Sequence, residues 1–115
     1  MPKASRDVRR GEVWLVGHTG SGSEIRGRRP ALILQNDTGN HFAATTIVAA
    51  ITTRAKPLPI LVPVPAGDGG LKTDSAVNLS QIQTVSMDRL ERRLGSLDAE
   101  QMDAVDRAIR ISLSV

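Results

Sequence analysis

The chain has 115 residues, a formal net charge of +3 and no cysteine. This length suits one domain with a single core. The absence of cysteine excludes disulfides, thiolate nucleophiles and structural zinc sites built on thiolates. Because Trp14 and Phe42 are the only aromatic residues, the core must be aliphatic, and base stacking on aromatic platforms is disfavoured as a way to bind nucleic acid.

Hydropathy and charge indicate where the protein is located and what kind of partner it binds. The sequence contains no apolar run of membrane-spanning length, and its start, MPKASRDVRRGE, lacks the apolar region of a signal peptide. We therefore expect a soluble, cytoplasmic protein. Residues 1–56 carry nine basic and four acidic side chains, whereas residues 57–115 carry six basic and eight acidic ones. A basic surface concentrated in the first half favours a polyanionic partner.

The first elements are predicted from polarity and periodicity. Residues 1–9 are polar and charged, which predicts a flexible N-terminal arm before a single domain over residues 10–115. The alternation in residues 12–16 indicates a strand. The Gly- and Ser-rich segment 17–29 predicts a long loop, and long loops in small domains are usually functional.

A series of strands should follow this loop. Pro30 is expected to open a buried strand, the cluster NDTGNH at 36–41 a turn, and residues 46–51 a second buried strand. The four prolines in residues 57–65 permit only an edge or irregular strand. Residues 76–85 predict one more strand, possibly bent, and MDRLERRLG fits either a helical turn or a strand.

The C-terminal segment carries the signature of a helix over residues 99–113. Asp98 with Gln101 three positions later forms a capping-box pattern. We expect Met102, Val105, Ile109 and Leu113 to face the sheet, with the pairs Asp103–Arg107 and Asp106–Arg110 on the opposite side. Strands followed by a last helix predict a mainly β (α+β) domain, a small curved antiparallel sheet or SH3-like barrel with a C-terminal helix.

Two side chains at expected strand ends suit phosphate chemistry. Arg29 lies where the long loop meets a strand, and Pro30 restricts its backbone to an extended conformation. Thr52 ends the run TTIVAAIT, where a hydroxyl can donate to a phosphate oxygen. By spacing alone, a solvated surface arginine is the favoured interpretation of Arg29, and an ordinary strand residue is the favoured interpretation of Thr52. Ser23 and Glu24 could supply hydrogen-bond donors and a carboxylate to the same site, although serine and glycine are common in any flexible loop.

Other chemistries find less support. His18 and His41 could form a two-histidine ribonuclease site, since histidine carries protons near neutral pH, but both lie in turn-rich segments. The segment GDGGLKTDS fails the P-loop pattern, because Leu71 separates the last glycine from Lys72. The scattered aspartates have no metal-ligand spacing, so neither a metal nor another cofactor is expected.

The ordered motifs RRGEVWLV, GSE, RP, ALILQNDTGN, VAAIT, SQIQTV and LDAEQMDAVDRAIRISL span residues 10–113. This series resembles the MazF/PemK family of endoribonuclease toxins, the mRNA interferases of type II toxin–antitoxin systems. The resemblance implies the curved-sheet fold shared by the MazF, CcdB and Kid toxins. It also implies metal-independent cleavage of single-stranded RNA to 2′,3′-cyclic phosphate and 5′-hydroxyl ends.

The resemblance assigns roles to particular residues. It implies that Arg29 and Thr52 are the catalytic pair and that Ser23 assists them. It also implies that Gln81 in the later strand contributes to RNA binding, and Glu24 lies beside that serine. From their positions in the chain, and not from the resemblance, we expect Glu24, Arg26, Arg28, Thr53 and Arg54 to contact RNA as well. This chain departs from many relatives, which have an acid before the glutamine and an arginine two residues after it, whereas Ser80 and Gln83 stand here. The departure bears on base preference.

The partners implied by the resemblance are single-stranded RNA, a cognate antitoxin protein and a second copy of the chain in a homodimer. Two non-catalytic alternatives remain open at this point. The domain could bind DNA gyrase, as structurally related barrel toxins do, or it could bind RNA without cutting it. The presence of both Arg29 and Thr52 favours cleavage.

Overall fold

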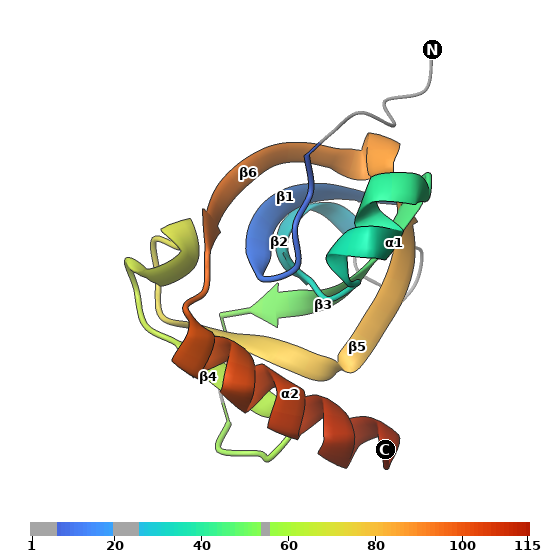
Figure 1. The fold of residues 1–115 in the computed structure, drawn as a ribbon. Coiled ribbons are helices and arrows are strands. Elements are labelled where there is room, and N and C mark those ends of the chain that lie inside the picture. Colours follow the sequence, from blue (N-terminus) through green and yellow to red (C-terminus); the bar gives the residue numbers. More distant parts are fainter. Residues whose placement is uncertain (1–6, 20–25, 54–55) are drawn as a thin grey trace.

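A computed structural model describes residues 7–19, 26–53 and 56–115. Within these ranges a single antiparallel sheet of six strands has the order β4-β5-β3-β2-β1-β6. The sheet is strongly curved, and α2 crosses one side of it (Figure 1). The strands are β1 (Glu12–Thr19), β2 (Arg26–Ile33), β3 (Thr45–Thr52), β4 (Leu61–Val64), β5 (Ser75–Ser86) and β6 (Leu90–Ser96), the helices α1 (Asp37–Phe42) and α2 (Ala99–Leu113), and the 3₁₀ turns η1 (Asp68–Gly70) and η2 (Met87–Arg89).

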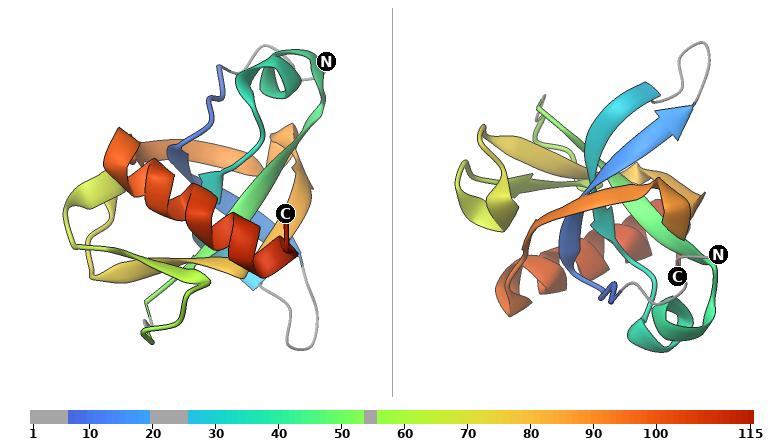
Figure 2. Two further views of the ribbon diagram at one scale, coloured as in Figure 1. Left: turned by 60° about the horizontal axis from the view of Figure 1, so that its bottom comes forward. Right: turned by 90° about the horizontal axis from the view of Figure 1, so that it is seen from above.

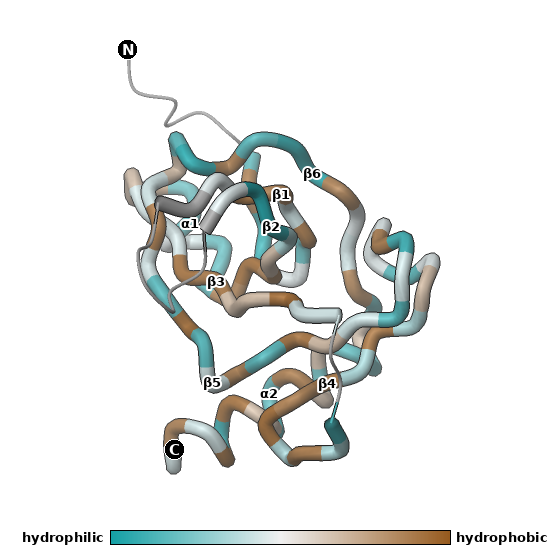
Figure 3. The backbone as a smooth tube through the Cα atoms, turned by 180° about the vertical axis from the view of Figure 1, so that it is seen from behind, coloured by the Kyte–Doolittle hydropathy of each residue, from teal (hydrophilic) through white to brown (hydrophobic). Residues whose placement is uncertain are grey.

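The curvature divides the buried side chains into two clusters, one on each face of the sheet. Leu32 belongs to the cluster beneath α2, which includes Val105 of that helix, while its neighbour Ile33 belongs to the other cluster with Trp14. Successive strand residues point to opposite faces, so β2 contributes to both clusters. Figure 3 shows hydrophobic residues along β3. Its four consecutive residues 48–51 are buried, so side chains on both faces of this strand are covered. The predicted α+β class, a curved antiparallel sheet with a C-terminal helix, is confirmed.

The hairpin of β1 and β2 is longer than predicted. The segment 17–29 was expected to be loop, but β1 continues to Thr19 and β2 begins at Arg26. Pro30 therefore lies inside β2 and does not open it. It is tolerated there because β2 pairs with β1 at this point, Pro30 opposite Leu15, whereas the ladder to β3 begins only at Ala31.

The connections also differ from the prediction. The expected turn at 36–41 forms the short helix α1, because the Asn36 side chain caps it by accepting from the Gly39 amide. The ambiguous segment 87–95 contains both alternatives, η2 followed by β6. The strand predictions at 46–51 and 76–85 are confirmed, and β4 is the expected edge strand, pairing only with β5.

The helix α2 has the predicted capping box between Asp98 and Gln101. Val105 is fully buried, but Leu113 is 54% exposed and does not pack on the sheet as predicted. Asp106 pairs with Arg10, 2.6 Å from its Nη2, across the fold. Neither helix of the described ranges is long and apolar enough to cross a membrane.

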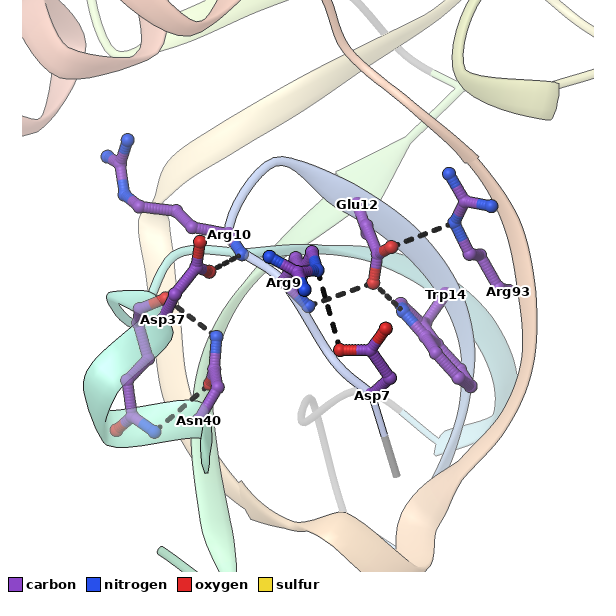
Figure 4. A network of polar contacts seen from close by, with 9 residues as sticks. Asp7, Arg9, Arg10, Glu12, Trp14, Asp37, Asn40 and Arg93 are labelled. Carbon is purple, nitrogen blue, oxygen red and sulfur yellow. Dashed lines mark hydrogen bonds and ion pairs between the residues drawn. The ribbon is translucent and has the colours of Figure 1, made fainter. Parts of the chain in front are cut away.

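A polar network holds the start of the domain (Figure 4). Glu12 is buried and accepts hydrogen bonds from the Arg9 amide, from Trp14 Nε1 and from Arg93 Nε. Val8 is buried against Trp14 in the same cluster. Residues 1–6 of the predicted arm lie outside the described residues, whereas residues 7–9 are held against the sheet by these contacts.

Candidate active site

The candidate catalytic side chains lie on neighbouring strands at one end of the sheet. In β2 and β3, Ala31 pairs with Ala50 and Ile33 with Val48. Arg29 and Thr52 lie two residues beyond Ala31 and Ala50, the last pair of this ladder. Residues two apart on a strand point to the same face. Arg29 and Thr52 therefore share the face of the sheet that Ala31 and Ala50 occupy.

The surroundings of this pair are apolar. Arg29 pairs on its other side with Val16 of β1, and Thr52 pairs on its other side with Ala76 of β5. Val16 and Ala76 are fully buried, while Arg29 is exposed and Thr52 half-buried. A guanidinium and a hydroxyl beside two aliphatic residues are groups that can bind a phosphate.

Several predicted site residues lie next to or outside the ranges that the structure describes. Ser23, Glu24 and Arg54 lie outside the described residues. Arg26 begins β2 opposite Thr19. Thr53 follows β3 and is exposed.

Gln81 lies at a bend of β5. Ala49 pairs with Ile82 and the next residue, Ala50, pairs with Asn78, so the three residues 79–81 have no counterpart on β3. The Asn78 Oδ1 accepts from both the amide and the hydroxyl of Ser80, at 3.0 and 2.6 Å, and so shapes this bulge. Gln81 is exposed beside it.

Asn78 is a residue that sequence reasoning missed. Its pairing with Ala50 places it on the face shared by Thr52, two positions along β3. The motif NLSQ could have indicated this role, because asparagine side chains often accept a hydrogen bond from the backbone amide two residues later and so form a local turn.

The predicted RNA-binding residue Arg28 already has a partner in the fold. Its Nε lies 2.9 Å from Glu91 Oε1 on β6. Glu91 was not identified from the sequence, because 63 residues separate it from Arg28 and no periodicity connects them.

The two histidines lie on separate elements of the fold. His18 lies near the end of β1, opposite Gly27, whereas His41 lies on α1 and stacks edge-on against Phe42 with ring centroids 4.6 Å apart. In the right view of Figure 2, α1 and the described parts of β1 and β2 nearest their connection lie at opposite ends of the picture. In the described ranges, no group of three or more His, Cys, Asp or Glu side chains is arranged to hold a metal ion.

Comparison with known proteins assigns the chain to a family. The model of the PemK-like, MazF-like toxins of type II toxin–antitoxin systems matches residues 9–113. The chain belongs to this family. The expectation drawn from the ordered motifs is thereby confirmed, and the match spans all strands and helices described above.

Members of the PemK/MazF family with known sequences or structures resemble the chain over nearly its whole length. Endoribonuclease EndoA of Bacillus subtilis is 43% identical over 111 residues, which cover 94% of this chain and 96% of EndoA. The Mycobacterium tuberculosis toxin MazF-mt6 is 29% identical with a TM-score of 0.79, covering 90% of this chain and 97% of its own. A mycobacterial endoribonuclease solved with its cognate antitoxin is 26% identical with a TM-score of 0.80, covering 94% and 96%.

Proposed function

We propose that this chain is a cytoplasmic endoribonuclease toxin that cleaves single-stranded RNA without a metal ion, leaving 2′,3′-cyclic phosphate and 5′-hydroxyl ends. The observation that supports the proposal is the register of β2 and β3, in which Arg29 and Thr52 follow the pair Ala31–Ala50 on one face of the sheet. The 43% identity to an endoribonuclease supports the same activity.

The chemistry follows from the two side chains. In this reaction the RNA 2′-hydroxyl attacks the adjacent phosphorus, and negative charge grows on the phosphate oxygens. The planar guanidinium of Arg29 can donate to two of these oxygens at once, which stabilises the transition state more than the ground state. Thr52 holds a phosphate oxygen through its hydroxyl.

Arg29 is assigned charge stabilisation and donation of a proton to the leaving 5′-oxygen. A guanidinium is protonated at rest, so it cannot accept the 2′-hydroxyl proton, but it can give a proton to the far more basic 5′-alkoxide and regain one from solvent. The attacking hydroxyl loses its proton to solvent water, and neither histidine is assigned that step.

The decisive experiment incubates purified protein with single-stranded RNA in EDTA and maps both new ends. We expect discrete cuts with cyclic phosphate on one side and a free 5′-hydroxyl on the other. Intact RNA, together with growth arrest on expression, would favour a gyrase-binding toxin. Retention of RNA without cutting would favour an RNA-binding module.

The proposal includes a homodimer. The last turn of α2 and the residues after it expose three hydrophobic side chains, Ile111 at 56%, Leu113 at 54% and Val115 at 79%. Exposed apolar patches often mark protein–protein interfaces, where a partner removes them from water. Light scattering should give twice the chain mass, and Ile111→Lys should lower it toward the monomer.

A cognate antitoxin is the second proposed protein partner. A solved mycobacterial relative was captured with its antitoxin. The basic first half of this chain would attract an acidic inhibitory segment to the surface that holds RNA. An antitoxin peptide with reversed charge that still inhibited fully would contradict this competition.

A further inference from the structure

Arg28 and Glu91 form an ion pair that spans three strands. Arg28 lies on β2 and Glu91 on β6, and β1 lies between them in the sheet. The Nε of Arg28 nevertheless lies 2.9 Å from Glu91 Oε1. The pair therefore crosses the intervening strand at the hairpin end where Arg29 is located.

Two local features let the carboxylate reach across β1. In the β1–β6 ladder Leu15 pairs with Arg92 and Val16 with Leu90, so Glu91 is an extra, bulged residue without a counterpart on β1. A bulge re-aims the side chain that it carries. Gly17 supplies the passage, because a Cβ built there would lie 3.0 Å from Glu91 Oε2. Gly17 itself pairs with Arg28.

The pair remains open to solvent. The Arg28 side chain is 73% exposed and that of Glu91 is 36% exposed. The Arg89 Nη1 lies 3.5 Å from the Gly17 carbonyl oxygen. A second guanidinium therefore lies beside the glycine that the Glu91 side chain crosses. An exposed pair of this kind adds only about 0.2–1 kcal/mol of stability, so stability alone is a weak reason for it.

From this geometry we infer that Arg28 is a second phosphate-binding position for RNA, distinct from the catalytic pair, and that Glu91 occupies it in the free protein. A carboxylate and a phosphate present similar paired oxygens to a guanidinium, so one can replace the other. The inference rests on the proposed RNA substrate and deepens it. Glu91 acts as a built-in competitor that weakens RNA binding.

The phosphate bound by Arg28 is not the one that is cleaved. Arg28 and Arg29 are consecutive in β2, and consecutive side chains point to opposite faces of a strand. Arg29 shares its face with Thr52, whereas Arg28 points away from them. Loss of the competitor should therefore change RNA binding and KM while leaving kcat unchanged.

The test measures binding to a single-stranded DNA oligonucleotide, which has the phosphates of RNA but lacks the 2′-hydroxyl and cannot be cleaved. Glu91→Gln keeps the size of the side chain and removes its charge. We expect Kd to fall about two- to fivefold at low salt, the fold-change that matches an exposed ion pair. The slope of log K against log salt should steepen by about 0.7, the value for one further phosphate contact on a single strand.

Arg28→Gln tests the position from the other side. In the Glu91→Gln background it should weaken binding and cancel the steepening of about 0.7, because the added phosphate contact is the one that Arg28 makes. Glu91→Gln added to Arg28→Gln should then have no further effect on the slope. Glu100→Gln, on the first turn of α2, removes the same charge elsewhere and controls for net charge.

The outcomes separate the two proposals. The inference would be overturned if Glu91→Gln left the salt slope of binding unchanged, or if it had the same effect with and without Arg28. Cleavage of RNA by the wild-type protein would still support the proposed function in either case. A protein that neither bound the oligonucleotide nor cut RNA would overturn both. A lower kcat for RNA in Glu91→Gln, with KM unchanged, would likewise overturn the role of Glu91 as a competitor.

Discussion

The two ends of the β1–β2 hairpin use their charged residues differently. Near the end of β2, Arg10 donates to the Leu34 carbonyl oxygen at 2.8 Å and to Asp106 at 2.6 Å, and its side chain is 30% exposed. At the start of β2, Arg28 is 73% exposed and Arg29 is exposed as well. The first end ties the N-terminal segment to α2, whereas the second presents guanidinium groups to solvent.

The comparison shows what separates a structural arginine from a binding one. Both ends have short basic motifs, RR at residues 9–10 and RGRR at residues 26–29. Only the fold brings Asp106 to the Arg10 guanidinium, whereas the buried Glu12 accepts from the Arg9 backbone amide. The Arg10 guanidinium donates to Asp106 and to the Leu34 carbonyl oxygen at once, so it has little left to offer a phosphate.

The largest expected effect concerns Arg29. Arg29→Ala should slow RNA cleavage by about 10²–10³-fold, the usual cost of removing one transition-state donor, with almost no loss of stability because the residue is exposed. Cleavage rates in EDTA and thermal melting measure the two quantities. Near-normal cleavage by Arg29→Lys would contradict the assigned role of the planar guanidinium.

The opposite end should show the reverse pattern. Glu12→Ala leaves the Arg9 amide and Trp14 Nε1 without their acceptor, which should destabilise the protein by about 2–3 kcal/mol. The turnover of the folded fraction should be unchanged. Urea unfolding gives the free energy, and Glu100→Ala on α2 is the control for a surface glutamate. If Glu12→Ala kept its stability but lost its activity, the assignment of a structural role to this end of the hairpin would be wrong.

An intermediate effect is expected at Thr52. Thr52→Val retains the shape and the strand preference of the residue but removes its hydroxyl. Loss of a hydrogen bond to a charged phosphate should reduce kcat/KM about tenfold. Thr53→Val, one residue further along, is the matched control and should have a smaller effect. An equal loss in both variants would mean that the register does not select Thr52.

The smallest expected effect concerns the bulge of β5. Asn78→Ala removes the acceptor of both Ser80 hydrogen bonds and should loosen the position of Gln81. We expect the relative cutting of competing RNA sites to change about two- to fivefold, with total activity retained. Sequencing of the cleavage products measures this preference. An unchanged pattern would remove Gln81 from the residues that select bases.

Much of the fold followed from local patterns. The capping box of Asp98 and Gln101 located α2, and the prolines of residues 57–65 identified β4 as an edge strand. The length of the β1–β2 hairpin was underestimated because Gly- and Ser-rich composition resembles a loop. Its strands extend because each pairs with the other, and pairing overrides composition.

The sequence by itself determined the fold class, the family and the choice of Arg29 and Thr52, because capping, periodicity and ordered motifs are local properties of the chain. Only the tertiary structure decided how the other arginines are used. Arg10 pairs with Asp106 of α2, and Arg28 with Glu91 through a bulge and the passage at Gly17. These contacts join residues far apart in the chain, and only the register of the strands and the packing of the helix bring them together.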